Sequence, residues 1–213
     1  MENNYIISFF QQLNSSDIRY VLLRNIDGEL PYSYSRGAKD IDLLVHPSDR
    51  KKFYGFMKRL KFIHCPHPLD KGSGLVYLYA VTPFDFFKHD GYFFDICYQM
   101  VCKSPNGGEY MPVDQIVQNS VWDNRKQNSQ FGWYELSNED LLVHLLTRCI
   151  FDKSTFKKGY TDKIEILKKE ADINALKKRL NMVFFKFTEK LINKVMNAEY
   201  DSIINDYFSF KEY

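Results

Sequence analysis

The sequence has little excess charge, no long apolar run and no clustered cysteines. Its formal net charge is only +2 over 213 residues, which does not favour nucleic acid as a partner. The longest apolar stretches, such as residues 20–23 and 92–98, are too short to span a bilayer. The first residues lack the basic segment of a secretory signal peptide, and the four cysteines are scattered without a paired zinc spacing. We therefore expect a cytoplasmic protein with reduced thiols and no membrane span.

What the chain does contain is enough apolar sequence for a sizeable core. Hydrophobic residues make up 45% of it and charged residues 26%, which is typical of a globular protein. Strand-like and helix-like patterns alternate up to residue 136, and helical periodicity dominates afterwards. The sequence predicts an α+β fold, with a mixed β-sheet and packed helices in residues 1–136 and a helical C-terminal domain in residues 137–213.

Local patterns predict the individual elements. Helical spacing of apolar residues predicts helices over 3–14 and about 48–60, and Ser137 with Asp140 resembles a capping box that opens a further helix. Asp90-Gly91 between two aromatic-rich runs predicts a β-hairpin. The other expected elements are strands at 19–23, 40–45 and 133–136, a loop at 24–39, an irregular stretch after 101, and helical segments at 162–170, 172–180 and 183–207.

The most informative motif is Lys39-Asp-Ile-Asp-Leu-Leu-Val45. Strand side chains alternate between faces, so Asp40 and Asp42 project from the same side of the predicted strand. Two neighbouring carboxylates repel each other and call for a cation, and Mg²⁺ is the usual partner of such hard oxygen ligands. Mg²⁺ bound to one or two carboxylates also binds nucleotide phosphates, which suits phosphoryl-type transfer.

A third aspartate fits the same picture. Asp95 lies within the aromatic run Tyr92-Phe-Phe-Asp-Ile-Cys-Tyr98, where a carboxylate is unusual without a specific role. If its strand lies beside the Asp40–Asp42 strand, the three carboxylates converge and two metal ions could bridge them. There are two alternatives. Asp40 and Asp42 could be solvated acids at the end of a strand, and Asp95 could be a buried, hydrogen-bonded structural residue.

With these residues the chain resembles the nucleotidyltransferase superfamily, which includes DNA polymerase beta and the aminoglycoside nucleotidyltransferases. The resemblance covers roughly residues 18–100: a first strand, a loop, a strand with Asp-x-Asp, and a later strand with a third acid. More narrowly, the Val21-Leu-Leu-Arg-Asn25 motif, the Asp-Ile-Asp strand and the segment from His144 to Lys153 are similar to small nucleotidyltransferase-like proteins of bacterial surface-polysaccharide synthesis. The resemblance implies a magnesium-dependent enzyme, with Mn²⁺ as an alternative metal. It would transfer a nucleoside monophosphate from a triphosphate such as ATP to a small hydroxyl or phosphate acceptor.

Five residues are expected to contact the nucleotide phosphates: Arg24, Asn25, Lys39, Arg148 and Lys153. The superfamily usually has Gly-Ser or Gly-Gly after the first strand, where this chain has Arg24-Asn25. The guanidinium of Arg24 could bind a phosphate directly. Arg148 and Lys153 begin a stretch rich in cations that extends to Arg179 and that could equally be a solvated helical face.

Two other readings of the same sequence stay open. A loop without the usual glycine favours a non-catalytic binding or regulatory module, and the same fold also suits a phosphotransferase that uses a nucleotide-activated alcohol. His64-Cys65-Pro66-His67 has no second ligand pair, so the sequence favours a loop over a zinc site there. The residues identify neither the nucleobase nor the acceptor, and they do not indicate an oligomeric state.

Overall fold

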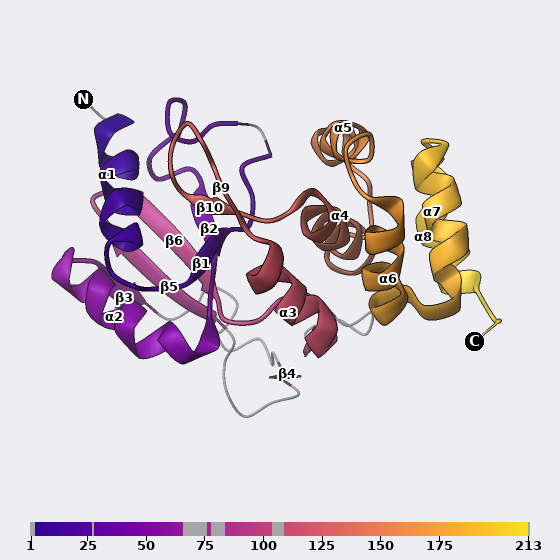
Figure 1. Cartoon of the computed structure of the whole chain (residues 1–213), viewed down its shortest axis with the longest axis horizontal. Helices are drawn as coiled ribbons and strands as arrows, with labels where there is room; N and C mark the ends of the chain where they lie inside the picture. The colour runs from indigo at the N-terminus through magenta and orange to yellow at the C-terminus, as the bar shows by residue number, and fades with distance from the viewer. Residues whose placement is uncertain (1–2, 27, 66–75, 78–83, 104–108, 213) are drawn as a thin grey trace. The chain divides into compact units, whose positions relative to one another are not determined.

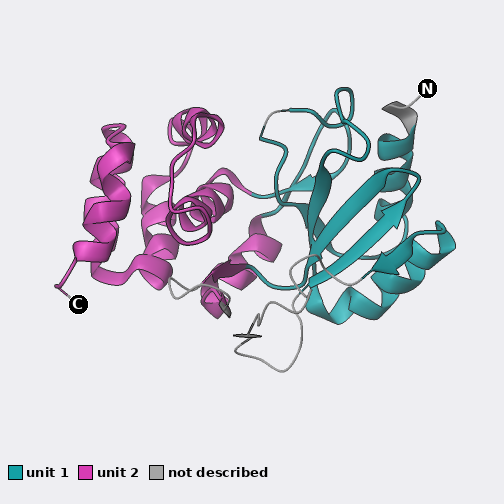
Figure 2. Cartoon of the chain, turned by 180° about the vertical axis from the view of Figure 1, so that it is seen from behind, with its two compact units in different colours: residues 1–100, 125–136 teal, residues 101–124, 137–213 magenta. Residues whose placement is uncertain are grey.

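The computed structural model describes residues 3–26, 28–65, 76–77, 84–103 and 109–212. It divides into two compact units, one formed by residues 1–100 and 125–136 and the other by residues 101–124 and 137–213 (Figure 2). The predicted domain border after residue 136 coincides with one of the borders between these units. Residues 101–124 belong to the second unit, and separate folding of a domain 1–136 stays a prediction.

The first unit is built on a mixed seven-stranded sheet, with strand order β3-β5-β6-β2-β1-β10-β9. The β2–β6 and β1–β10 pairs are parallel and the other pairs are antiparallel. Its helices are α1 (Asn3–Asn14) and α2 (Arg50–Arg59), the latter entered through a 3₁₀ turn at Pro47–Asp49. The strands of the sheet are β1 (Tyr20–Leu22), β2 (Asp40–Val45), β3 (Ile63–Cys65), β5 (Phe84–His89), β6 (Tyr92–Cys97), β9 (Lys126–Gln127) and β10 (Tyr134–Glu135), and the short strand β4 (Val76–Tyr77) is not part of it.

Helices α1 and α2 pack on one face of this sheet (Figure 1). Phe9 of α1 lies 4.4 Å from the Phe94 ring, centroid to centroid, and both side chains are buried with Ile41 and Leu43 of β2. Burying one such side chain contributes about 1.5–3 kcal/mol to folding. The sheet therefore has one face sealed by apolar packing, and the alternation of strand residues sends their neighbours to the opposite face.

The hairpin that carries β6 follows its sequence closely. Asp90 and Gly91 both have positive φ, 45° and 75°, as a two-residue type I′ hairpin turn requires. A Cβ at Gly91 would lie 3.3 Å from the Cβ of Arg36, so this position is also tight. The turn fixes the register of β5 against β6, and with it the position of Asp95.

The second unit is mainly helical and begins with the antiparallel strands β7 (Val101–Lys103) and β8 (Glu109–Pro112). Helix α4 packs against α3, α5 and α6, and a π-helical turn at Arg148–Asp152 continues it. The helices of this unit are α3 (Gln115–Asn124), α4 (Asn138–Thr147), α5 (Lys158–Leu167), α6 (Ile173–Phe184), α7 (Thr188–Met196) and α8 (Tyr200–Ser209).

The structure confirms the α+β class, the mixed sheet and the helical C-terminal part, and it corrects three local predictions. Residues after 101 are not wholly irregular, since they form β7, β8 and α3. The helical pattern predicted over 183–207 is interrupted at Phe185 and Ala198, whose φ angles are 48° and 59°. The predicted loop at His64 is strand β3, paired with β5.

Candidate functional site

Strand β2 places two carboxylates on the face of the sheet that α1 and α2 leave uncovered. Ile41 and Leu43 are buried against the helices at 2% and 0% exposure. The alternating residues Asp40 and Asp42 are exposed and partly buried, respectively. The polar positions of this strand thus share one side, as the Asp-x-Asp spacing predicts.

Strand β6 brings in the third carboxylate. It runs parallel to β2, and Asp42 is paired directly with Asp95 in the register. One carboxylate oxygen from each of Asp40, Asp42 and Asp95 lies within 4.8 Å of the others. The structure therefore gathers the three aspartates that the sequence singles out, and Asp95 is neither distant from the pair nor sealed in the core.

Arg24 is the charged neighbour of this acid cluster. Leu23 donates its backbone N–H to the carbonyl of Asp42 at 3.0 Å, which places the next residue beside that strand. The Arg24 guanidinium forms an ion pair with the Asp42 carboxylate. Both side chains are largely shielded from solvent, at 18% and 16% exposure.

The protonation of Asp42 reflects these neighbours. Burial raises the pKa of its carboxyl group, Arg24 opposes that rise, and the charges of Asp95 and Asp40 add to it, so that the net shift is upward. One arginine therefore does not fully offset the burial of this carboxylate together with the repulsion from its two neighbours. A bound divalent cation would add the positive charge that the cluster lacks.

The donor set suits such a cation. Three carboxylates offer hard oxygen ligands on one surface, which is the chemistry that Mg²⁺ and Mn²⁺ prefer. Mg²⁺ typically takes one or two protein carboxylates and keeps its other positions for water and phosphate oxygens. The three aspartates are thus the residues that would hold the metal.

Two other predicted phosphate ligands lie in the loop between β1 and β2. The Asn25 side chain bonds the backbone of Leu30, accepting from its N–H at 3.1 Å and donating to its carbonyl at 3.3 Å. Lys39 forms an ion pair with Glu29. Both contacts fold the loop on itself, and the roles of Asn25 and Lys39 at a nucleotide stay predictions.

The remaining predicted phosphate ligands, Arg148 and Lys153, belong to the second unit. Arg148 contacts the Asp152 carboxylate at 3.2 Å and the Tyr160 hydroxyl at 3.4 Å. Lys153 is exposed at the end of the π-helical turn. Such turns often occur at functional sites, and the expected contact of Arg148 and Lys153 with phosphate stays a prediction.

Comparison with known proteins adds little to this geometry. No family model and no curated protein matches the sequence. Among solved structures, the chain is similar to the solution structure of the antibiotic-resistance factor ANT(2'')-Ia, described as showing substrate-regulated conformation dynamics. The TM-score is 0.48 and the identity 8%, over 99% of this chain and 100% of that one. A likeness at this level says nothing about the site, whose chemistry follows from its own residues.

His64, part of the cysteine and histidine motif, serves a different cluster. Its Nε2 lies 2.9 Å from the Asp85 carboxylate, which also accepts from both ends of the Arg50 guanidinium fork at 3.1 and 3.2 Å. Pro66 and His67 of the motif lie outside the described residues. The visible part of the motif thus joins β3 to β5 and α2.

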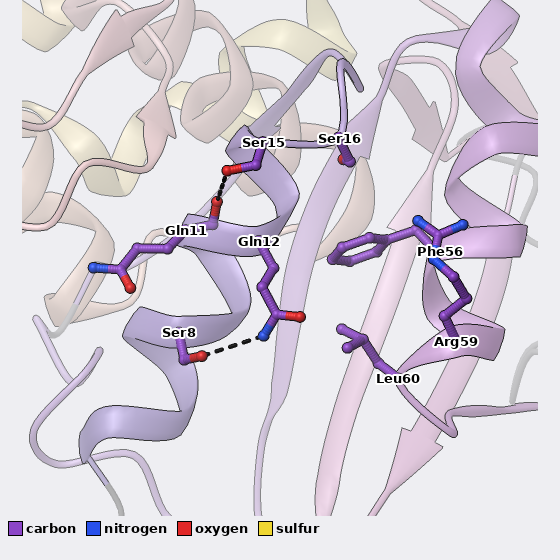
Figure 3. A pocket seen from close by; sticks show the side chains of 8 residues that line it. All are labelled: Ser8, Gln11, Gln12, Ser15, Ser16, Phe56, Arg59 and Leu60. Atoms are coloured by element: carbon purple, nitrogen blue, oxygen red, sulfur yellow. Dashed lines mark hydrogen bonds between the residues drawn. The ribbon is translucent and has the colours of Figure 1, made fainter.

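A separate pocket of about 560 Å³ opens between α1 and α2 (Figure 3). On its α1 side, Gln12 Nε2 donates to Ser8 Oγ at 3.2 Å, and Oγ of Ser15, the residue after the helix, donates to the Gln11 carbonyl at 3.0 Å. None of the three aspartates lines this pocket. It belongs to the helix-covered side of the first unit and not to the acid cluster.

No helix in the described residues is long and apolar enough to cross a membrane.

Proposed function

We propose that the chain is a metal-dependent nucleotidyltransferase, which moves a nucleoside monophosphate from a triphosphate to a small hydroxyl or phosphate acceptor. The observation that carries the proposal is the gathering of Asp40, Asp42 and Asp95 within 4.8 Å on one face of the sheet. The resemblance of the sequence to the superfamily points the same way. Mg²⁺ or Mn²⁺ bound there would neutralise phosphate charge and polarise the reacting oxygens.

Arg24 supplies the cation on the nucleotide side of the reaction. Its guanidinium already pairs with Asp42, and a planar guanidinium binds phosphate through two parallel hydrogen bonds. With a metal held by the three aspartates, the Arg24 guanidinium would be available to the triphosphate beside the cluster. Asn25, Lys39, Arg148 and Lys153 are the further phosphate ligands in this proposal.

Asp95 serves the acceptor in this scheme. It accepts the proton of the acceptor oxygen, which forms a bond to the α-phosphorus while the bond to the β-phosphate oxygen breaks. Pyrophosphate leaves with both electrons of that bond, and Arg24 stabilises its charge. The identity of the acceptor as a surface-polysaccharide precursor, and a cytoplasmic location, rest on the sequence alone.

The test compares Asp42→Asn with Asp17→Asn in the intact chain. Asp17 is 97% exposed and pairs with Lys52 on the surface, so its substitution changes charge without touching the acid cluster. We expect Asp42→Asn to lose metal-dependent triphosphate binding and to lower pyrophosphate release by roughly 100-fold or more. Calorimetry with each of the four ribonucleoside triphosphates and Mg²⁺, beside a pyrophosphate assay, measures both; full activity of Asp42→Asn would refute the metal assignment.

The Arg24–Asp42 ion pair supports a second candidate, a non-catalytic binding or regulatory module. In that case Arg24 neutralises Asp42 permanently, and no triphosphate binds with Mg²⁺ to the wild-type chain. Clear magnesium-dependent binding of any of the four triphosphates would exclude it. A phosphotransferase acting on a nucleotide-activated alcohol would instead release nucleoside monophosphate and no pyrophosphate.

A further inference from the structure

Two phenylalanines lie beside the acids on the same face of the sheet. Phe86 of β5 is paired with Asp95 in the register, and Phe93 of β6 is paired with Asp40. Paired residues on neighbouring strands share a face. The sequence could have indicated this arrangement, because Phe93 precedes Asp95 by two positions in a strand that alternates.

The two rings stack on one another. Their centroids lie 5.9 Å apart with an angle of 17° between the planes. Both side chains are partly exposed, whereas Phe87 and Phe94, their neighbours in sequence, are buried at 1% and 0% exposure. The fold therefore keeps one phenylalanine of each Phe-Phe pair in the core and leaves the other partly open on the acid face.

The acid cluster has different chemistry on its two flanks. On the β1 side, Arg24 forms the ion pair with Asp42 and suits phosphate. On the β5 side, Phe86 lies one strand from Asp95, a spacing of about 5 Å between neighbouring strands. Arg24 thus flanks the carboxylates on the β1 side and Phe86 on the β5 side, where Lys88 is paired with Phe93 further along the strand.

We propose that Phe86 and Phe93 form a stacking surface for the ring of the acceptor, and that the acceptor is a cyclic sugar or similar ring compound, not an open-chain polyol. This inference rests on the proposed function, which assigns Asp95 to the acceptor. The apolar C–H face of a sugar ring packs flat on an aromatic ring, so a hydroxyl on its edge can face Asp95. An open-chain polyol has no such flat face and gains little from the pair.

The test uses saturation-transfer NMR on the full chain with three kinds of probe. These are methyl glycosides of glucose, galactose and N-acetylglucosamine as ring probes, ribitol as the open-chain probe, and adenosine as the nucleobase probe. We expect ring C–H signals from at least one glycoside and an affinity at least about five-fold weaker in Phe86→Leu and Phe93→Leu. Phe208→Leu is the matched control, since Phe208 is a half-exposed phenylalanine of α8 at 50% exposure.

Each other outcome overturns the inference. No glycoside binding by the wild-type chain, or equal binding by Phe86→Leu and Phe93→Leu, removes the ring site. If ribitol also binds, and binds more weakly to Phe86→Leu and Phe93→Leu, the surface does not select for rings. If only adenosine binds more weakly to these variants, the surface belongs to the nucleobase. Calorimetry with Mg²⁺ and triphosphates on the same variants keeps the two proposals apart, because Phe86→Leu and Phe93→Leu should retain that binding whether or not they lose the glycoside. Circular dichroism checks that both variants are folded.

Discussion

Each unit of the chain holds an aspartate paired with an arginine, and the surroundings of the two pairs are opposite. Asp140 in α4 is fully buried and accepts hydrogen bonds from Ser120 and Ser137, both at 2.7 Å, beside the Arg179 side chain at 2.9 Å. Its neighbours are all donors. Asp42 has Arg24 as its cation, but two further carboxylates share its site.

The difference separates a structural carboxylate from one held for a ligand. Asp140 joins α3, α4 and α6, and each contact stabilises its charge. At Asp42, burial and then the like charges of Asp95 and Asp40 oppose ionisation and outweigh the Arg24 pair, so the folded protein carries an unfavourable arrangement. Such arrangements persist where a bound ligand relieves them, which is the case we argue for the acid cluster.

The largest expected effect is on the Asp140 side of this comparison. Asp140→Asn removes a fully buried charge and leaves the largely shielded Arg179 side chain without its counterion, so the free energy of unfolding should fall by about 3–5 kcal/mol. Asp123→Asn, at an exposed position of α3, should change it by no more than about 0.5 kcal/mol. Urea unfolding followed by circular dichroism measures both, and equal effects of the two substitutions would remove the structural role of Asp140.

The sequence predicts strand β2 and the β5–β6 hairpin well because their signals are local. Alternation in β2 and the Asp90-Gly91 turn depend on a few neighbouring residues, and the structure has both as predicted. The direct pairing of Asp42 with Asp95 depends on the register of two strands far apart in sequence. From the sequence alone, one can say only that the carboxylates converge if the two strands are neighbours. The Arg24–Asp42 ion pair depends on long-range placement in the same way.

Helix α3 shows what local patterns miss. Its sequence is polar, and its buried side includes Gln118 and Ser120, so apolar periodicity is weak. Ser120 is held by the Asp140 carboxylate, a contact twenty positions away in the chain. The interruption of the helical pattern at Phe185 is also missed, because this residue has a positive φ although it is not a glycine and no glycine or proline lies next to it.

A smaller effect is expected from adding metal. Mg²⁺ that binds the folded acid cluster and not the unfolded chain should stabilise the wild-type protein by about 2.7 kcal/mol at a hundredfold excess over its Kd. Asp42→Asn should lose most of this gain, whereas Asp17→Asn should keep it. Thermal unfolding with and without Mg²⁺ measures the shift, and a shift of the same size in Asp42→Asn would place the metal elsewhere.

The smallest expected effect is that of Asp42→Asn on the melting temperature when no metal is present, where the substitution should stabilise the protein. The raised pKa of Asp42 means that its charge opposes folding in full above that pKa, and that the penalty shrinks as the pH falls from there towards the ordinary aspartate pKa. Asp42→Asn should therefore raise the melting temperature near neutral pH, and the gain should shrink as the pH falls. Melting curves from about pH 8 to about pH 4 test this, across the range above the ordinary aspartate pKa.

Asp49 provides the matched control, because its substitution should change the melting temperature in the opposite direction. Burial alone would raise the pKa of its carboxyl group, but hydrogen bonds from the side chain and backbone N–H of Arg19, at 2.8 and 3.1 Å, lower it overall. Its charge therefore stabilises the fold above the ordinary aspartate pKa, and that contribution is lost as the pH falls through the lowered value. Asp49→Asn should lower the melting temperature near neutral pH, where Asp42→Asn raises it. A fall in both variants would mean that the Arg24 pair outweighs burial and the two neighbouring acids, and the unfavourable arrangement assigned to the acid cluster would then be absent.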